Sequence, residues 1–145
     1  MIIASFDISH KKYYDICLSI RTQVFVVEQQ VPVHLECDEY ENCSQYFLGF
    51  LEHTPVATAR IRQTTQGIKL ERFASLPEYR NKGLGKELMQ HIVHYVTVIH
   101  PGKILYLHSQ ISAVGFYTKM GFETVGEMFI EASIPHYVMK ISSHG

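Results

Sequence analysis

The sequence predicts an α/β fold in which one mixed, mostly antiparallel sheet of about seven strands is flanked by helices. Its 145 residues, 46% hydrophobic and 12% aromatic, suffice for one packed core. Segments with strand and helix patterns follow the order strand, helix, three strands, helix, strand, helix and two strands. No repeat, low-complexity segment or linker divides the chain, so we expect a single domain over residues 1–145.

The first third of the chain predicts a strand, a helix and a connection. IIASFD at residues 2–7 has the weak alternation of a strand. The next segment has helical spacing, with Arg21 as the charged position among Tyr14, Cys17, Leu18, Val24 and Phe25. Pro32 ends this pattern. Residues 31–43, VPVHLECDEYENC, have no clean period and four acidic residues, so we interpret them as an irregular, exposed connection.

The middle of the chain predicts an antiparallel meander followed by a long helix. QYFLGFLE (45–52) and VATARIRQT (56–64) flank a short turn, and IKLERFAS (68–75) follows a second turn. Apolar residues then recur at helical spacing from Leu84 to Ile99. This spacing outweighs the β-branched residues near the end of the segment, which favour a strand by propensity alone.

The last third predicts a strand, a helix and two strands. KILYLHS (103–109) is a short apolar strand that follows a Pro-Gly stop. SAVGFYTKM (112–120) has helical character and ends at Gly121. ETVGEMFI (123–130) and HYVMKIS (136–142) supply the final two strands.

Charge and cysteine usage exclude several classes of function. Thirteen basic and 14 acidic residues leave a formal charge of -1, so no global field attracts nucleic acid or an anionic membrane. The chain has neither a long apolar run nor a leader pattern at its start, so we expect a cytoplasmic protein. Cys17, Cys37 and Cys43 lack CxxC spacing and fit reduced thiols. His34 lies near two of them, but zinc ligands are usually spaced in tighter pairs, so we expect no metal.

RNKGLG, residues 80–85, opens the long helix directly after a strand and a turn. The first amides of a helix have no intrahelical acceptor, and the helix dipole adds positive charge to them. Gly83 and Gly85 would let an oxyanion approach, and Arg80, Lys82 and Lys86 supply full charges. This pattern predicts a pyrophosphate site. The alternative is a tight turn with glycine caps and a solvated basic rim, and neither GxxxxGK[ST] nor a GxGxxG unit is present.

The R-x-x-G-x-G pattern after a meander resembles the acyl-CoA loop of the GNAT superfamily of N-acetyltransferases. LERFASLPEYRNKGLGKELM resembles the fourth strand and acyl-CoA helix of that family, and LYLHSQISAVGFYTKMGFETVGEMF resembles the fifth strand, next helix and final hairpin. RTQVFVVEQQVP, ECDEYE and FIEASIPHYVM resemble its ElaA/YjcF-like branch, so the likeness covers nearly the whole chain. Asn81 and Ser133 stand where the family often has glycine, and Ser75 replaces a usual apolar residue.

The resemblance implies that acetyl-CoA binds where strands four and five splay apart. Backbone groups near Phe73 and Ser75 would pair with the pantetheine arm, and the amides of residues 81–86 would hold the pyrophosphate. Ordinary strand packing is the alternative for Phe73 and Ser75, and helix capping is the alternative for Ser112. The implied cofactor-binding residues are Phe73, Ala74, Ser75, Arg80, Asn81, Lys82, Gly83, Leu84, Gly85, Lys86, Gln110, Ser112, Phe116 and Tyr117.

Acetylation of an amine requires a base, because an alkyl ammonium with a pKa near ~10.4 is mostly protonated at neutral pH. Glu71 is the first candidate, on the opposite face of its strand from Leu70 and Arg72. The alternative is a surface carboxylate paired with Arg60, Arg62 or Arg72.

Tyr117 and His136 complete the predicted catalytic set. Tyr117 matches the helix position at which many GNAT enzymes carry a tyrosine near the cofactor sulfur, where its hydroxyl could donate a proton. The alternative is a core tyrosine between Phe116 and Phe122. His136 follows Pro135 and could orient an acceptor, relay a proton or cap the strand.

The residues assigned to the acceptor lie in the segments that match the ElaA/YjcF-like branch. Acidic groups there would suit a cationic amine, although each alone is more often a surface or capping residue. The candidates are Glu28, Gln29, Glu36, Asp38, Glu131 and His136.

The leading functional hypothesis is an acetyl-CoA-dependent N-acetyltransferase that transfers acetyl directly to a small amine or a protein amine. No cysteine adjoins the expected acyl site in sequence. One alternative is a non-catalytic acyl-CoA-binding sensor or interaction module, and another is a nucleotide- or phosphosugar-binding domain that uses the same loop. Exposed strand edges permit a homodimer.

Overall fold

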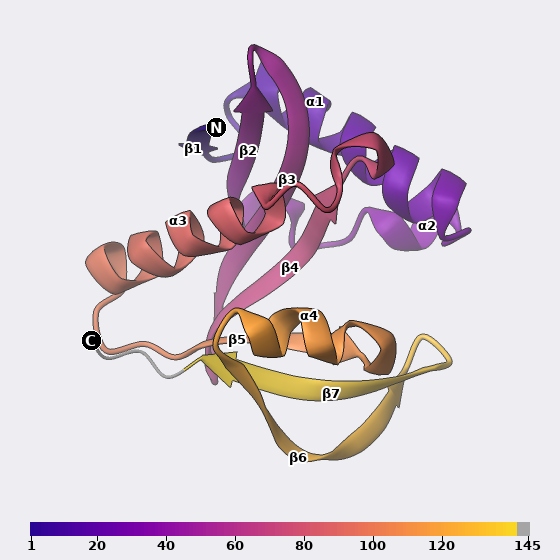
Figure 1. The fold of residues 1–145 in the computed structure, drawn as a ribbon, viewed down its shortest axis with the longest axis vertical. Helices are drawn as coiled ribbons and strands as arrows, with labels where there is room; N and C mark the ends of the chain where they lie inside the picture. Colours follow the sequence, from indigo (N-terminus) through magenta and orange to yellow (C-terminus); the bar gives the residue numbers. More distant parts are fainter. Residues whose placement is uncertain (142–145) are drawn as a thin grey trace.

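The computed structural model describes residues 1–141. Seven strands form one sheet in the order β1-β2-β3-β4-β5-β7-β6, in which only the β4–β5 pair is parallel (Figure 1). The mixed, mostly antiparallel sheet of the α/β prediction is therefore confirmed. The strands are β1 Ile2–Phe6, β2 Gln45–Leu51, β3 Thr54–Thr64, β4 Gly67–Ser75, β5 Leu105–Gln110, β6 Phe122–Glu131 and β7 Ile134–Ile141. Residue 142, at the end of the last predicted strand, lies outside the described residues.

Helices follow the predicted order, with short turns between them. The α-helices are α1 Lys11–Arg21, α2 Val33–Glu36, α3 Leu84–Ile99 and α4 Val114–Lys119. A π-helical segment, η1 Thr22–Glu28, continues α1, and the 3-10 turns are η2 Glu41–Cys43, η3 Pro77–Tyr79 and η4 Ile111–Ala113. Gly121 has a φ of +98°, a left-handed conformation that ends α4 as predicted.

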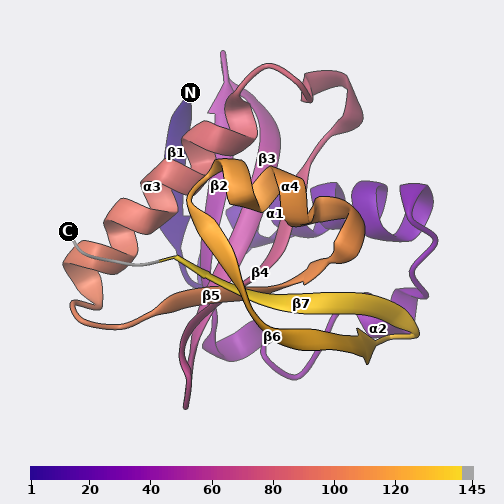
Figure 2. The ribbon, with the colours of Figure 1, turned by 60° about the horizontal axis from the view of Figure 1, so that its bottom comes forward.

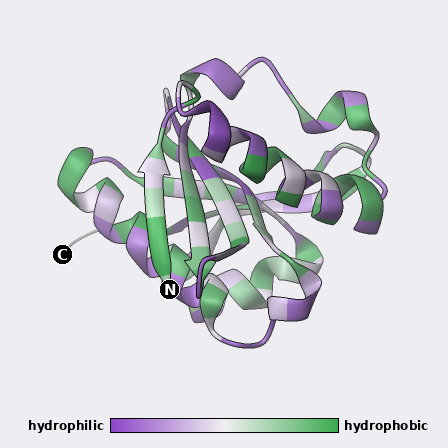
Figure 3. Cartoon of the chain, turned by 90° about the horizontal axis from the view of Figure 1, so that it is seen from above, coloured by the Kyte–Doolittle hydropathy of each residue, from purple (hydrophilic) through white to green (hydrophobic). Residues whose placement is uncertain are grey.

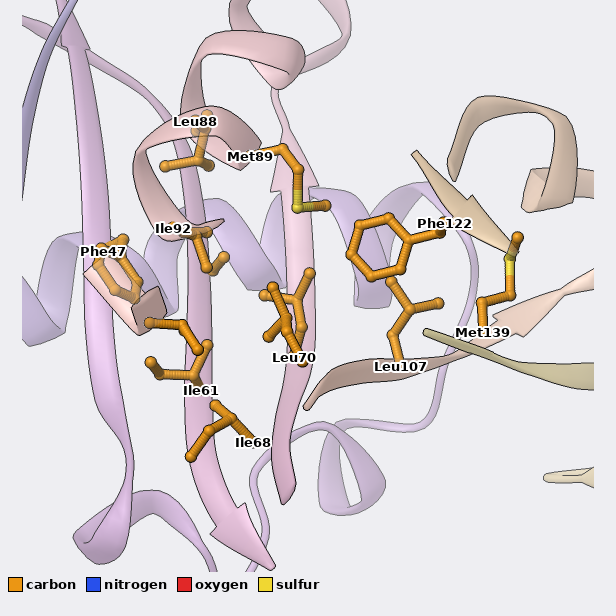
Figure 4. Packing of buried hydrophobic residues seen from close by; sticks show 14 of the residues in the cluster. Phe47, Ile61, Ile68, Leu70, Leu88, Met89, Ile92, Leu107, Phe122 and Met139 are labelled. Carbon is orange, nitrogen blue, oxygen red and sulfur yellow. The ribbon is translucent and has the colours of Figure 1, made fainter. Parts of the chain in front are cut away.

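Two apolar clusters lie on the two faces of the sheet, because successive strand residues point to opposite sides. Phe47 packs with α3, whereas its neighbours Tyr46 and Leu48 pack with α1. Below α3, Leu70 of β4 and Leu107 of β5 meet in the same cluster (Figure 4). Each helix carries both hydrophobic and hydrophilic residues, as expected for helices that cover a sheet (Figure 3).

The prediction of an exposed, irregular connection over residues 31–43 is wrong in two respects, although most of these residues are exposed. The segment contains α2 and η2, and the side chains of Glu36 and Glu41 are buried. Arg21, the charged position on the first helix, is also buried and donates hydrogen bonds to both carboxylates. Burial of these charges is feasible because they are paired with one another.

A β-bulge in β4 changes the direction of its side chains. The register passes from Arg60 opposite Glu71 to Thr58 opposite Ala74, so two residues of β4 face one residue of β3. Arg72, within the bulge, has a φ of +53°. Strict alternation predicts Glu71 and Arg72 on opposite faces of the sheet. This prediction is wrong, because the bulge brings both side chains to the same group of charges. Arg72 donates a hydrogen bond to Asp38, and Glu71 accepts one from Arg60, which also binds Asp38.

Strands β4 and β5 separate after a short paired stretch. They pair through Ile68 with Leu105 and Lys69 with Tyr106, and their remaining residues are not paired with each other. The two strands diverge beyond this point (Figure 1). The predicted splay is thus present, and it opens toward α4 and the loop before α3.

Candidate active site

A cavity of about 580 Å³ lies where β4 and β5 separate, and we call it the central cavity. Its wall includes Phe73 of β4, Leu107 of β5 and Tyr117 of α4. Residues of the η1–α2 region and of the β6–β7 hairpin form other parts of its wall, and the β6–β7 turn and α2 lie at the same end of the molecule (Figure 2). Residues that are far apart in sequence therefore form one chamber.

Tyr117 lies on the wall of the central cavity among aromatic rings. Its ring centroid is 6.3 Å from that of Phe73 and 5.9 Å from that of Phe122, both in edge-on geometry. Desolvation raises the pKa of its hydroxyl to about 12, so the hydroxyl keeps its proton at neutral pH. Tyr117 is thus a packed aromatic residue of the cavity wall that carries a protonated hydroxyl.

Glu71 belongs to a group of paired charges that we call the ionic network. It consists of Arg21, Glu36, Asp38, Glu41, Arg60, Arg62, Lys69, Glu71 and Arg72. The Glu71 carboxylate accepts hydrogen bonds from Arg60 at 2.9 Å and Arg62 at 2.8 Å, and Lys69 lies 3.2 Å away. The network joins α1, α2, η2, β3 and β4 beside the central cavity.

The pairing makes Glu71 a weak base. Burial alone would raise the pKa of its carboxyl, but the hydrogen bond from Arg62 and the charges of Arg60 and Lys69 outweigh it and lower the pKa to about 2. A carboxylate with so low a pKa has little affinity for the proton of an ammonium group. The geometry favours the alternative interpretation, in which Glu71 is paired with Arg60 and Arg62, although its side chain is buried and not on the surface.

Glu71 should contribute to stability in a pH-dependent way. Its folded-state pKa of about 2 lies below the ordinary value of 4.5, so its contribution is present above pH 4.5 and is lost as the pH falls toward 2. Urea unfolding at a series of pH values should show wild type losing more stability over this interval than Glu71→Gln, which has no carboxyl to protonate. Equal losses in the two proteins would contradict this assignment.

Two histidines and a glutamate form another part of the cavity wall. His108 Nδ1 lies 3.0 Å from one Glu131 oxygen, and His136 Nε2 lies 3.8 Å from the other. The Phe129 ring lies against both imidazoles, with centroids 5.1 Å from His108 and 5.8 Å from His136. Glu131 is half exposed, whereas its partner His136 is buried. This arrangement places a carboxylate and two imidazoles at one point of the cavity.

The loop before α3 exposes its backbone at the helix N-terminus. Residues 81–83 are exposed, and Gly83, the N-cap of α3, has a φ of +78°. Asn81, where the family often has glycine, has a φ of +63°, which asparagine tolerates better than most residues. Ser133, the other such position, has a φ of +66° in the β6–β7 turn. The backbone conformation accounts for the glycine preference at both positions.

The two glycines of the loop have different surroundings. A Cβ atom at Gly83 would meet nothing within 4 Å, whereas one at Gly85 would lie 3.3 Å from the ring of Phe116 and 3.7 Å from that of Phe73. Gly85 therefore makes room for the aromatic rings that connect the start of α3 with the central cavity. The space around Gly83, by contrast, is open.

Arg80 joins the loop to the N-terminal half of the chain. Its guanidinium donates to both carboxylate oxygens of Glu28, at 2.6 and 2.7 Å, and also to the backbone carbonyl of Ser75. The hydrogen bonds from Arg80 lower the pKa of Glu28. Two residues predicted for different parts of the site are thus bound to each other.

The structure brings together many of the predicted site residues but not all of them. The central cavity is lined by Gln29, Glu36, Glu71, Phe73, Gln110, Ser112, Tyr117, Glu131 and His136. Asp38 is bound by Arg60 and Arg72 in the ionic network, and Ala74 is buried against α1. The loop residues Arg80, Asn81, Lys82, Gly83, Leu84, Gly85 and Lys86, together with Ser75, lie outside the cavity wall, at the N-terminal end of α3.

His108 and Arg72 line the cavity but were not predicted. His108 lies two residues before Gln110 on β5, so strand alternation alone could have placed both on one face. Arg72 reaches the cavity only because of the β4 bulge, which leaves no clear signal in the sequence.

Other possible reaction centres receive no support from the described residues. Cys17, Cys37 and Cys43 are free thiols, and none lines the central cavity. Within residues 1–141, no three or more His, Cys, Asp or Glu side chains are arranged so that they could hold a metal ion. No helix in this range is long and apolar enough to span a membrane.

Comparisons with known proteins agree with this geometry. Residues 15–143 match the model of the acetyltransferase (GNAT) domain. The uncharacterized N-acetyltransferase YjcF of Bacillus subtilis is 35% identical over 83% of this chain and 86% of its own. Escherichia coli ElaA is 31% identical over 84% of this chain and 82% of its own.

Two crystal structures share the whole fold. That of E. coli ElaA superposes with a TM-score of 0.87 at 26% identity and covers 97% of this chain and 99% of its own. An acyl-CoA N-acyltransferase from Pseudomonas aeruginosa gives 0.85 at 25% identity, with the same coverage. The fold and the family match define an acyltransferase. The chain belongs to the GNAT acetyltransferase family and is similar to the ElaA and YjcF proteins, as the sequence predicts.

Proposed function

We propose that the protein is an acetyl-CoA-dependent N-acetyltransferase that transfers acetyl directly to a primary amine of a small molecule or a protein. The central cavity carries this proposal, because it opens between β4 and β5 beside a glycine-started helix and has Tyr117 in its wall. Membership of the GNAT family and the likeness to an acyl-CoA N-acyltransferase support it.

The donor is proposed to bind along the splay, with its pyrophosphate at the N-terminus of α3. The amides of the exposed residues 81–83 and the helix dipole would favour an anion there, and the exposed Lys82 and Lys86 add charge. Arg80 would contribute by fixing the loop through Glu28 and Ser75. The acyl end would then lie near Phe73, Gln110 and Tyr117.

The acceptor amine is proposed to bind beside Glu131. Among the acidic residues that line the cavity, Glu36 and Glu71 are paired with arginines, whereas Glu131 has only histidine partners. A cationic amine would therefore find its counter-charge at Glu131. His108 or His136 could then take the proton, since imidazole is the side chain that changes charge nearest to neutral pH.

The proposed reaction has one bond-forming and one bond-breaking change. The ammonium group first loses one proton to an imidazole, and the neutral amine nitrogen bonds to the acyl carbon. As the carbon–sulfur bond breaks, the nitrogen releases its second proton to solvent and becomes the amide nitrogen. The leaving sulfur takes the hydroxyl proton of Tyr117, which solvent later replaces. No acyl-enzyme is required, and none of the three cysteines lies at the cavity wall.

Thiol release from acetyl-CoA, measured with pools of amines, tests the proposed function. We expect release that depends on both the enzyme and an amine, together with a higher melting temperature in acetyl-CoA. Saturable binding without release for any amine would favour an acyl-CoA sensor. Neither binding nor release would contradict the proposal.

Replacing Tyr117 with phenylalanine should lower kcat about 100-fold, which is within the range for removal of a general acid. Acetyl-CoA binding should change little, because the ring and its packing against Phe73 and Phe122 are retained. The measurement is kcat across a pH series, with acetyl-CoA affinity as the control. Unchanged turnover at every pH would exclude Tyr117 as the acid.

We also propose that the protein is cytoplasmic and forms a homodimer. Three free thiols suit a reducing compartment such as the cytoplasm. The edge strands β1 and β6 offer unpaired backbone to a second copy of the chain, which supports a homodimer.

A further inference from the structure

A second cavity of about 490 Å³, which we call the basic groove, lies next to the central cavity. Arg62, Lys69, Tyr106, Val125, Val138 and Lys140 form most of its wall. Lys69 and His108 line both the groove and the central cavity, so the two spaces are neighbours.

Strand geometry places the groove on the face of the sheet away from α3. Leu105 and Leu107 belong to the cluster beneath α3, so the alternating residues Tyr106 and His108 point to the other face. Lys140 of β7 lies directly opposite Tyr106 in the register and therefore shares its face. The ionic network, including Glu71 and Arg62, lies on this same face.

The groove combines an apolar floor with a basic rim. Tyr106, Val125 and Val138 provide the floor, and none of the described residues that line the groove is acidic. Arg62 and Lys69 share the single carboxylate of Glu71, at 2.8 and 3.2 Å. Lys140 has no ion-pair partner among residues 1–141, even though Glu123 lies opposite it in the β6–β7 register. The rim therefore has an excess of positive charge.

We propose that the basic groove binds the distal end of the acceptor, and that the acceptor is an amine on an apolar arm that ends in an anionic group. This inference rests on the proposed function, because it places the reacting amine beside His108 and Glu131. The anionic group would lie near Lys140, with the arm over Tyr106 and Val138.

Strand spacing gives the length of the arm. Two residues along β5 separate His108 from Tyr106, which amounts to about 7 Å, and four separate Gln110 from Tyr106, or about 13 Å. A linear arm of six to ten carbons covers this range, whereas an α-amino acid is too short. The class predicted is therefore an ω-amino acid or an ω-aminoalkyl phosphate.

The test compares matched amines that differ only in the distal group. We expect wild-type kcat/KM for 8-aminooctanoate or 8-aminooctyl phosphate to exceed that for octylamine about tenfold. The anionic amine with the higher kcat/KM then shows whether the groove prefers a carboxylate or a phosphate. Lys140→Glu should lower this ratio about tenfold, and Lys140→Gln should lower it less. Lys12→Glu, which makes the same charge change at an exposed lysine of α1, should leave the ratio unchanged.

The outcomes separate this inference from the proposed function. Turnover of all amines with no preference for the anionic ones, or a ratio that Lys140→Glu leaves unchanged, would overturn the groove while the acetyltransferase stands. If no amine is acetylated, the proposed function fails. Calorimetric binding of N-acetyl-8-aminooctanoate in the presence of CoA then decides: loss of binding in Lys140→Glu supports the groove, and absent or unaffected binding overturns it.

Discussion

Acetyl-CoA should bind Gly83→Asp at least tenfold more weakly than wild type. The change places a carboxylate at the N-cap of α3, where the partial positive charge of the helix is greatest, and like charge would repel the pyrophosphate. A Cβ atom at Gly83 would meet no protein atom within 4 Å, so the substitution causes no steric clash at this atom. Titration calorimetry with acetyl-CoA measures the effect.

A matched control separates repulsion from backbone strain. Gly102 has a φ of +80°, close to the +78° of Gly83, and a Cβ atom there would also meet nothing within 4 Å. Gly102→Asp therefore introduces the same strain and charge at the far end of α3. Because the helix dipole favours a negative charge at the N-terminus and disfavours one at the C-terminus, Gly102→Asp should lose at least as much stability as Gly83→Asp, but only Gly83→Asp should lose affinity. Full affinity in Gly83→Asp would remove the loop from the cofactor site.

Glu41→Gln should lower the free energy of unfolding by about 3–5 kcal/mol, the usual cost of breaking a buried ion pair. The Glu41 carboxylate accepts hydrogen bonds from Arg21 at 2.8 Å and Arg60 at 2.9 Å. Burial alone would raise the pKa of Glu41, but these hydrogen bonds and charges hold it well below its usual range. The neutral amide leaves both buried arginines short of a counter-charge, and the melting temperature should fall by roughly 10 °C.

Glu39 provides the control for this stability measurement. It lies two residues away, is exposed, and has no ion-pair partner among residues 1–141. Glu39→Gln should therefore change the urea-unfolding free energy by less than about 0.5 kcal/mol. If the two variants were equally stable, the ionic network would not hold α2 and η2 in place.

The order of the elements could be predicted because it depends on local patterns. The helical spacing from Leu84 to Ile99 and the strand pattern of the meander both depend on which residues lie in the core, and the structure confirms them. The segment 31–43 could not be predicted in this way. Two of its acidic residues, Glu36 and Glu41, are buried because they pair with Arg21 and Arg60 of other elements, and no pattern within the segment indicates those partners.

The site was predictable to the extent that it follows the backbone order. The glycine loop and Tyr117 occupy positions fixed by sequence spacing relative to a strand and a helix. The pairing of Glu71 with Arg60 and Arg62 follows the alternative that the sequence offered, but the one-residue bulge next to Glu71 and its contact with Lys69 were not predictable. The pairing of His108 with Glu131 likewise depends on a contact between β5 and the end of β6.

The short pairing between β4 and β5 has a mechanical consequence. Only two residue pairs join the halves of the sheet through the backbone, so side chains such as Met89 of α3, Leu70 and Leu107 must hold them together. The volume of these side chains, and not backbone hydrogen bonding between β4 and β5, then determines how far apart the two strands lie. A change in core volume beneath α3, far from any ligand, would therefore widen or narrow the chamber.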